Sequence, residues 1–266
     1  MKLESTGERV IVEDRPTSIE DYVIYMGHIA TYRFAERFAH GRRVLDHGCG
    51  SGYGAALLAE TARDVQAVDV DEDAIDHARQ RFQRGNLTFA HIQPTAPLPY
   101  PDRAFDTVVS FQVFEHVRSV AHYLSETRRV LEPGGTLLLA TPDRSMRLFP
   151  LQKPWNRWHI REYSARMLAE VLSRFFCQVE ILNMSGRRDV IDIELRRFRK
   201  FKWLTLPATL PIVPDPLRVW LLNMQHRLRG ATRRPRMRHN PDFDESAFVI
   251  GPGLQPSLNL VAIARA

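Results

Sequence analysis

The feature that most constrains the fold is an alternation of two kinds of segment between Arg43 and Ala140. Short apolar runs rich in Val and Leu alternate with segments whose apolar residues recur three and four positions apart. Apolar runs of this kind are typical of strands covered on both faces, and the helical segments supply the crossovers of a parallel sheet. The sequence predicts an α/β chain with a doubly wound, mainly parallel, seven-stranded sheet. The expected strands are 43–48, 65–70, 87–92, 105–111, 135–141, 177–182 and 258–264.

The first expected strand runs into a glycine-rich loop, "VLDHGCGSGYG", at 44–54. A strand that ends in such a loop before a helix places backbone N–H groups at the carboxyl edge of the sheet, where open α/β sheets bind ligands. A Walker-type phosphate loop would need Gly-Lys-Ser/Thr, and no Lys lies near. A dinucleotide fingerprint is met only if Ala55 replaces its last glycine, and the chain lacks a Tyr-x-x-x-Lys pair. An NAD-dependent oxidoreductase is therefore a disfavoured alternative.

The same loop resembles the D-x-G-x-G-x-G loop of class I S-adenosylmethionine-dependent methyltransferases, and the other motifs of that family follow in order. "AVDVDEDAI" is similar to the second motif, and "LPYPDRAFDTVVS" and "YLSETRRVLEPGGTLLLATP" resemble the fourth and fifth strands. The similarity covers Val44 to about Leu182, and "TGERV" and "HIATYRFA" upstream resemble bacterial members encoded with glycan-assembly enzymes. The resemblance implies a Rossmann-like methyltransferase fold, methyl transfer as the activity and S-adenosyl-L-methionine as the cofactor.

The resemblance also implies which residues meet the cofactor. The glycine loop would admit its amino acid part, and Asp69, 23 residues beyond Asp46, would accept hydrogen bonds from both ribose hydroxyls. The family usually has an acid after the third strand for the adenine amino group, but this chain reads "HIQPTAP", so Gln93, Thr95 or a backbone carbonyl must substitute. A non-catalytic protein that holds the cofactor or its product is a second alternative. The expected cofactor-binding residues are Asp46, Gly48, Cys49, Gly50, Gly52, Asp69, Val70, Gln93, Thr95 and Phe111.

Candidate catalytic residues follow the fourth and fifth expected strands. "FQVFEHV" places Glu115 and His116 at the carboxyl edge of the sheet, and "NRWHIREY" brings His159 to the same edge. A hydroxyl acceptor needs a base that takes its proton, and His titrates near neutral pH, or a metal that lowers its pKa. The pattern resembles the metal site of small-RNA 2′-O-methyltransferases and ubiquinone-pathway O-methyltransferases, although Gln112 replaces the first Glu. Glu115, His116 and His159 are the expected catalytic residues, and ligation of a divalent metal by the three is one of the roles that the sequence leaves open. A metal-free His base, or a solvated helix start at Glu115 and His116, are the alternatives.

Positive charge is concentrated in one segment. From Arg187 to Arg238 there are 14 Lys or Arg and 4 Asp or Glu, in a chain whose net charge is +6. This segment precedes the last expected strand, so we read it as an insertion. The expected regions are an N-terminal helical lid segment (1–40), an S-adenosylmethionine-binding domain (41–186 with 257–266) and a basic insertion containing Trp and Pro (187–256).

The composition of the insertion bears on partners. Trp203 and Trp220 accompany its basic residues, a combination suited to peripheral contact with an anionic membrane and to a lipid-linked glycan acceptor. A lid packed on the catalytic domain is the alternative, and a nucleic-acid surface is less favoured. The absence of a signal-like or spanning run and the two cysteines predict a cytoplasmic location. The interfacial reading of the insertion adds peripheral contact with the inner membrane surface as an option. The sequence favours O-methylation of a sugar, glycolipid or other small hydroxyl acceptor, with RNA methylation as an alternative.

Overall fold

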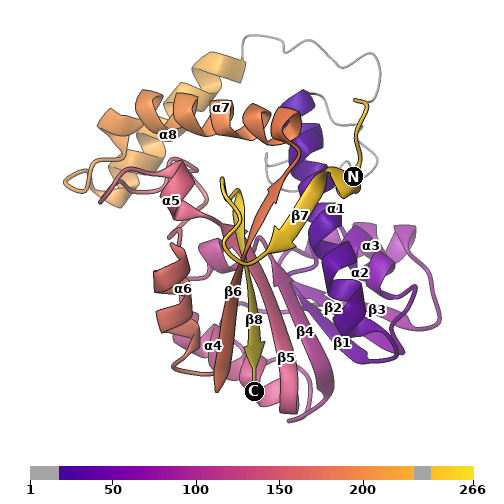
Figure 1. The fold of residues 1–266 in the computed structure, drawn as a ribbon. Coiled ribbons are helices and arrows are strands. Elements are labelled where there is room, and N and C mark those ends of the chain that lie inside the picture. The colour runs from indigo at the N-terminus through magenta and orange to yellow at the C-terminus, as the bar shows by residue number, and fades with distance from the viewer. Residues whose placement is uncertain (1–17, 231–240) are drawn as a thin grey trace.

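The computed structural model describes residues 18–230 and 241–266, and an eight-stranded sheet lies at its centre with helices on both faces (Figure 1). The strand order is β3-β2-β1-β4-β5-β8-β6-β7. The strands are β1 (Arg43–His47), β2 (Asp64–Asp69), β3 (Leu87–His91), β4 (Phe105–Phe111), β5 (Leu131–Pro142), β6 (Gln178–Gly186), β7 (Phe248–Gly251) and β8 (Asn259–Arg265).

The pairing confirms a doubly wound, mainly parallel sheet. Strands β3, β2, β1, β4 and β5 pair in parallel, whereas β8 runs antiparallel between β5 and β6. The expected number of seven strands was wrong by one, because β7 pairs antiparallel with β6 at the edge of the sheet. Its four residues, "FVIG", are too few to show the alternation by which a strand is recognised in sequence.

Helices cover the two faces in separate groups, each with its own apolar cluster. Val44 of β1 belongs to the cluster of the first face, and its neighbour Leu45 belongs to the cluster of the second, as the alternation of a strand requires. The first face carries α1 (Ile19–Ala39), α2 (Tyr53–Leu58) and α3 (Glu72–Arg81), and the second carries α4 (Val120–Val130) and α6 (Ala165–Leu172).

A further layer lies over the carboxyl edge of the parallel strands, at the top of Figure 1. In it α7 packs against α1 and α5, and Val190, Ile191 and Phe198 of α7 share a third apolar cluster with Val23 of α1. The elements of this layer are α5 (Arg144–Arg147), α7 (Arg188–Leu204), the 3₁₀ turn η2 (Leu206–Ala208) and α8 (Asp215–Gly230), with the short turns η1 (Phe114–His116) and η3 (Glu245–Ala247) nearby.

The expected division into three regions stays a prediction, but two observations bear on it. The 187–256 segment contributes β7 to the sheet besides its helices. Residues 1–17 of the expected lid segment and 231–240 of the expected insertion lie outside the described residues. Within the described ranges, no helix is both long and apolar enough to cross a membrane.

Candidate active site

The glycine loop between β1 and α2 lies against the tip of β2. The Asp69 carboxylate accepts the N–H of Gly50 through Oδ2 at 2.8 Å and the N–H of Asp71 through Oδ1 at 2.9 Å. Gly50 has a φ of +53°, and a Cβ placed on it would meet nothing within 4 Å. The loop therefore forms an open cradle beside a fixed carboxylate, which suits the methionine part and the ribose of S-adenosylmethionine.

Gly54, the last glycine of the motif, has a different role. A Cβ at this position would lie 1.9 Å from Cζ of Tyr32, whose ring comes from α1. The hydroxyl of Tyr32 donates to Oδ2 of Asp46 at 3.1 Å. The absence of a side chain at Gly54 thus lets α1 approach the sheet and reach Asp46, a packing requirement that the sequence pattern did not reveal.

Asp46 is fully buried at the end of β1, and burial raises its pKa to about 7, with a further upward contribution from Asp69 and an opposing one from the Tyr32 hydrogen bond. Within residues 18–230 and 241–266, its Oδ1 atom has no hydrogen-bond partner. A buried carboxylate oxygen without a donor suits the ammonium of the cofactor's amino acid part. Burial also raises the pKa of the Cys49 thiol, so the thiol is uncharged at neutral pH.

The other expected cofactor residues are spread along the same edge. Val70 follows β2 and is 51% exposed, which suits packing against a flat apolar ring. Gln93 and Thr95 are exposed in the loop after the neighbouring β3. Phe111 ends β4 and is buried edge-to-face against Tyr32, with ring centroids 4.9 Å apart. Their roles toward the cofactor stay predictions.

The three expected catalytic residues come together. Glu115, His116 and His159 each offer a ligand atom, and these atoms lie within 4.8 Å of one another. The solvated helix start is wrong for Glu115, which is 1% exposed and accepts a hydrogen bond from Thr141 Oγ1 at 2.9 Å. The backbone carbonyl of Glu115 accepts the N–H of Ile160 at 2.9 Å, which ties η1 to the loop that carries His159.

Both imidazoles are oriented through their Nδ1 atoms. His116 Nδ1 lies 3.1 Å from the carbonyl oxygen of Trp158, which can only accept, so Nδ1 carries the proton. His159 Nδ1 lies 2.7 Å from Oε1 of Glu162 and donates to that carboxylate. In their neutral forms both rings therefore have the lone pair on Nε2, the atom that ligates a metal or takes a proton.

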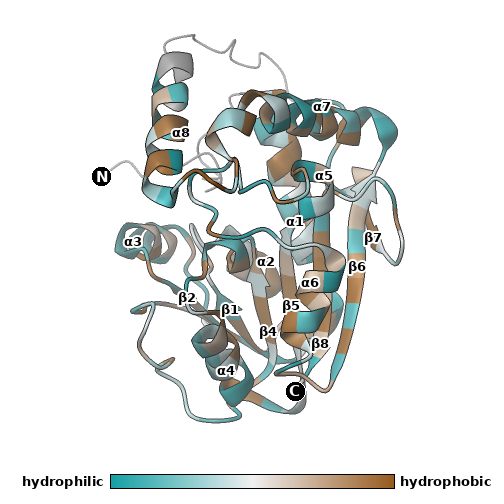
Figure 2. Cartoon of the chain, turned by 90° about the vertical axis from the view of Figure 1, so that its left-hand side faces the viewer, coloured by the Kyte–Doolittle hydropathy of each residue, from teal (hydrophilic) through white to brown (hydrophobic). Residues whose placement is uncertain are grey.

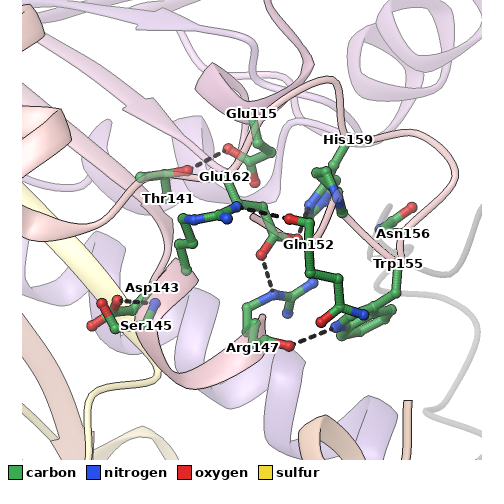
Figure 3. Close-up of polar contacts among 12 residues, drawn as sticks. Glu115, Thr141, Asp143, Ser145, Arg147, Gln152, Trp155, Asn156, His159 and Glu162 are labelled. Atoms are coloured by element: carbon green, nitrogen blue, oxygen red, sulfur yellow. Dashed lines mark hydrogen bonds and ion pairs between the residues drawn. The ribbon is translucent and has the colours of Figure 1, made fainter. Parts of the chain in front are cut away.

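The carboxylate behind His159 is itself held in place (Figure 3). Oε2 of Glu162 accepts Nε of Arg147 at 3.0 Å, and both side chains are buried. Burial alone would raise the pKa of Glu162, but the charge of Arg147 and the His159 hydrogen bond outweigh it, so the pKa is lowered. Arg147 lies over the Trp155 ring at 4.3 Å. Neither Glu162 nor Arg147 was predicted from the sequence. The position of Glu162, three residues after the candidate His159, could have pointed to it.

The 187–256 segment also contacts the loop that carries His159. Arg218 of α8 is 5% exposed, and its guanidinium donates to the carbonyl oxygens of Pro154 at 2.8 Å and His159 at 3.4 Å. Arg157 in turn donates to Asn223 of α8 at 3.0 Å. The basic segment is therefore part of the framework that positions His159.

The residues of the cluster fit a divalent ion. Two imidazoles and one carboxylate suit borderline metals such as Mn²⁺ or Zn²⁺ better than Mg²⁺, and each His is supported by a second hydrogen bond as ligating histidines usually are. Gln112 stands outside the set of three and adopts a φ of +57° at the end of β4.

A small cavity of about 60 Å³ lies between α1, α7 and the ends of β4 and β5, and Arg147, the partner of Glu162, is part of its lining. Gln112 and Arg147 line one part of it, and Glu194 of α7 lines another. Glu194 is 4% exposed, and its Oε2 pairs with Arg197 at 2.8 Å, whereas its Oε1 is buried and has no hydrogen-bond partner among the described residues. Burial raises the pKa of Glu194. A ligand in this cavity would meet an acceptor that lacks a donor.

Comparisons with known proteins bear on the family and the fold. The family described as "Methyltransferase domain" matches residues 45–139. A probable S-adenosylmethionine-dependent methyltransferase of Mycolicibacterium smegmatis is 42% identical over 66% of this chain and 65% of its own length. A ubiquinone biosynthesis O-methyltransferase of Methylococcus capsulatus is 31% identical over 42% of this chain and 48% of its own length. The alignments thus span less than two thirds of the length of either relative.

A solved structure shares the fold. The structure of a methyltransferase from Thermotoga maritima, described as a possible histamine N-methyltransferase, superposes with a TM-score of 0.57 over 91% of each chain at 14% identity. The motif order, the sheet topology and these matches agree with one another. Residues 45–139 match the methyltransferase-domain family, and the described chain has the fold of the class I S-adenosylmethionine-dependent methyltransferases, whose cofactor is S-adenosylmethionine.

Proposed function

We propose that the protein transfers the methyl group of S-adenosylmethionine to a hydroxyl oxygen of a neutral acceptor, a sugar or glycolipid being preferred. One observation carries the proposal: the Glu115–His116–His159 cluster adjoins the glycine loop. A Cβ on Gly48 would lie 2.3 Å from Cγ2 of Val113, so the loop touches the segment that leads into η1. A methyl donor held by the loop would therefore have this cluster as its neighbour.

The chemistry asks little of the protein beyond alignment and removal of one proton. The sulfonium is an activated donor, and its displacement requires that donor and acceptor be held in line. Glu115, His116 and His159 would hold a divalent ion, which when bound lowers the pKa of a hydroxyl. Without a metal, one of the two histidines would instead receive the acceptor's proton on Nε2, because the Nδ1 hydrogen bonds to Trp158 and Glu162 keep the lone pair on that atom.

The cavity supports a neutral, hydroxylated acceptor. Oε1 of Glu194 can accept a hydrogen bond from a ligand, whereas the Glu194 carboxylate would repel a ligand carboxylate. A cationic ligand would meet Arg197, which pairs with Glu194, and Arg147 on the same lining. A hydroxyl satisfies both conditions. A volume of about 60 Å³ is small beside the several hundred Å³ of a usual ligand pocket, so the cavity would take only one end of the acceptor.

The names of the relatives support oxygen as the methylated atom. The Methylococcus capsulatus relative is named as an O-methyltransferase of ubiquinone biosynthesis. That name describes the relative, and its acceptor is not carried over to this chain.

The test is a methyl-transfer screen with radiolabelled S-adenosylmethionine and three acceptor panels: neutral glycans and glycosides, lipid-linked sugars, and RNA. We expect label in a glycan or glycolipid product that is stable to mild base, as an ether is. Label only in RNA would overturn the acceptor class. Binding of S-adenosylhomocysteine without transfer to any panel would favour a non-catalytic cofactor-binding protein.

Glu194→Gln sharpens the test of the acceptor site. The variant keeps the shape of the side chain but removes the charge and turns one oxygen into a donor. We expect a KM for the acceptor raised about tenfold, with an unchanged affinity for S-adenosylhomocysteine. Arg188, exposed at the start of α7, provides the matched control as Arg188→Gln. Equal KM values in the two variants would contradict the assignment of Glu194.

A further inference from the structure

Exposed apolar side chains are concentrated on one part of the molecule. Among the described residues, 13 large apolar side chains are exposed, and ten of them lie within 151–160 and 203–224. The most exposed are Ile212 at 85%, Leu151 at 79% and Trp203 at 65%. Single exposed apolar residues are ordinary on a protein surface, but a concentration of this kind marks an interaction site.

Hydrogen bonds show that these two segments lie side by side. Nε2 of Gln152 donates to the carbonyl oxygen of Lys202 at 3.1 Å, at the end of α7. Nζ of Lys153 donates to the carbonyl oxygen of Val213 at 2.8 Å, next to Ile212. The Arg157–Asn223 bond joins the same loop to α8. Residues 149–161 and 196–225 thus form one continuous region, here named the docking surface.

Helix α8, which belongs to the docking surface, has an exposed apolar side and a buried side. Leu217, Trp220 and Met224 of α8 are spaced three and four residues apart and are exposed at 46%, 57% and 41%. Arg218 and Leu222, on the other side of the helix, are buried. Figure 2 shows hydrophobic and hydrophilic bands on α8, which stands apart from the sheet. An outward apolar stripe of this kind is suited to an apolar environment beyond the protein.

Charge selects the partner. Residues 149–161 and 196–225 contain nine Lys or Arg and one acid, Asp215, which pairs with Lys153 and Arg218. Arg196, Arg199 and Lys200 are exposed. Basic side chains interleaved with Trp and aliphatic residues match the interface of a bilayer that contains anionic lipid. A nucleic acid would use the basic groups but would gain nothing from aliphatic side chains such as Leu151 and Ile212.

We propose that the docking surface binds the protein peripherally to anionic lipid membranes. The exposed Trp and aliphatic side chains enter the headgroup boundary, and the basic side chains contact the lipid phosphates. Neither the binding nor its test depends on methyl transfer.

The position of the docking surface relates it to the site. Trp158 and Ile160 belong to the surface and flank His159, and the carbonyl of Trp158 fixes the His116 ring. Membrane binding would therefore bring the loop that carries His159 to the lipid interface. If the proposed function holds, this favours an acceptor with a lipid part.

Flotation with sucrose-gradient liposomes tests the proposal. The full chain is mixed with vesicles of phosphatidylcholine alone or of phosphatidylcholine with phosphatidylglycerol, at about 0.1 M and about 1 M salt, where the Debye length is about 10 Å and about 3 Å. We expect recovery with the anionic vesicles at low salt, weaker recovery at high salt, and little with neutral vesicles. Equal recovery on both vesicle types, or none on either, overturns the proposal.

Two variants separate the apolar from the electrostatic contribution. Trp203→Ser with Trp220→Ser should lower the partition coefficient about tenfold or more, and Arg199→Glu with Lys200→Glu should weaken binding to anionic vesicles and reduce its salt dependence. Val249→Ser is the control, because Val249 is 56% exposed but lies on β7, outside the docking surface. Circular dichroism and S-adenosylhomocysteine affinity confirm folding of each variant. Binding of a single-stranded RNA with no flotation of the wild-type protein would instead identify a nucleic-acid surface.

Discussion

Nδ1 of His159 lies 2.7 Å from Oε1 of Glu162, and both side chains are fully buried. The other oxygen of this carboxylate, Oε2, accepts a hydrogen bond from Nε of Arg147 at 3.0 Å. The relationship makes His159 the end of a fixed chain of three side chains, so its ring orientation is set before any ligand arrives. A carboxylate behind a ligating imidazole is a common support of metal sites and raises the basicity of the ring.

Glu162→Gln should therefore weaken metal binding by Glu115, His116 and His159, although the Gln side chain fills the same space as Glu162. We expect affinity for Mn²⁺ to fall about 10- to 100-fold while S-adenosylhomocysteine affinity stays unchanged. Calorimetric titrations of the two ligands check the result. A merely structural role would change both affinities together or neither.

The same variant should change the pH dependence of stability. The pKa of Glu162 is lowered from its ordinary value of 4.5, so its ionised form stabilises the fold above about pH 4.5, and this contribution is lost as the pH falls through the lowered folded-state value. Wild-type protein should thus lose stability on acidification more steeply than Glu162→Gln. Urea midpoints measured across this range test the prediction, with the exposed Glu170→Gln as control. Equal slopes in wild type and Glu162→Gln would contradict it.

Two glycines of one loop should respond differently to alanine. Gly54→Ala would drive a Cβ into the Tyr32 ring, so we expect a loss of stability of about 1–3 kcal/mol or more from overpacking. Gly50→Ala meets open space and carries only the cost of a positive φ, about 1–2 kcal/mol, but it should lower cofactor affinity by occupying the cradle. Thermal unfolding and S-adenosylhomocysteine titration separate the two effects. Normal cofactor affinity in folded Gly50→Ala would remove the cradle from the account.

Cofactor binding should depend on pH through Asp46. Its pKa is raised to about 7 by burial, so the carboxyl is neutral below this pH and charged above it. If Oδ1 accepts the cofactor ammonium, S-adenosylhomocysteine affinity should fall as the pH drops through about 7, and Asp46→Asn should remove the dependence. Titrations on either side of this pH check it, and a flat wild-type profile would show that Asp46 does not meet the ammonium.

Metal dependence should be visible without knowledge of the acceptor. Electron paramagnetic resonance should detect one bound Mn²⁺ per chain, displaced by Zn²⁺ more readily than by Mg²⁺. Glu115→Gln should weaken this binding, whereas Glu170→Gln should not. Once an acceptor is found, EDTA should abolish transfer and Mn²⁺ should restore it. Undiminished transfer in EDTA would contradict metal dependence and indicate that a histidine of the cluster acts as a base without a metal.

The sequence predicted the parts of the fold that repeat a pattern. Apolar runs and helical periods located β1 to β5. The positions of Glu115, His116 and His159 after β4 and β5 predicted their convergence, because the carboxyl ends of parallel strands share one edge. Contacts between distant segments could not be predicted in this way. The approach of Tyr32 to Gly54 and the support of the His159 loop by Arg218 depend on how α1 and α8 pack on the sheet.

The most direct test of the central claim is methyl transfer by a variant with both His116→Ala and His159→Ala. Radiolabelled S-adenosylmethionine supplies the methyl group, and the glycan or glycolipid identified in the screen is the acceptor. The account predicts that transfer falls about 10²-fold or more while S-adenosylhomocysteine still binds, because the cofactor loop is left intact. Full transfer activity in the double variant would contradict the account and leave positioning alone as the mechanism.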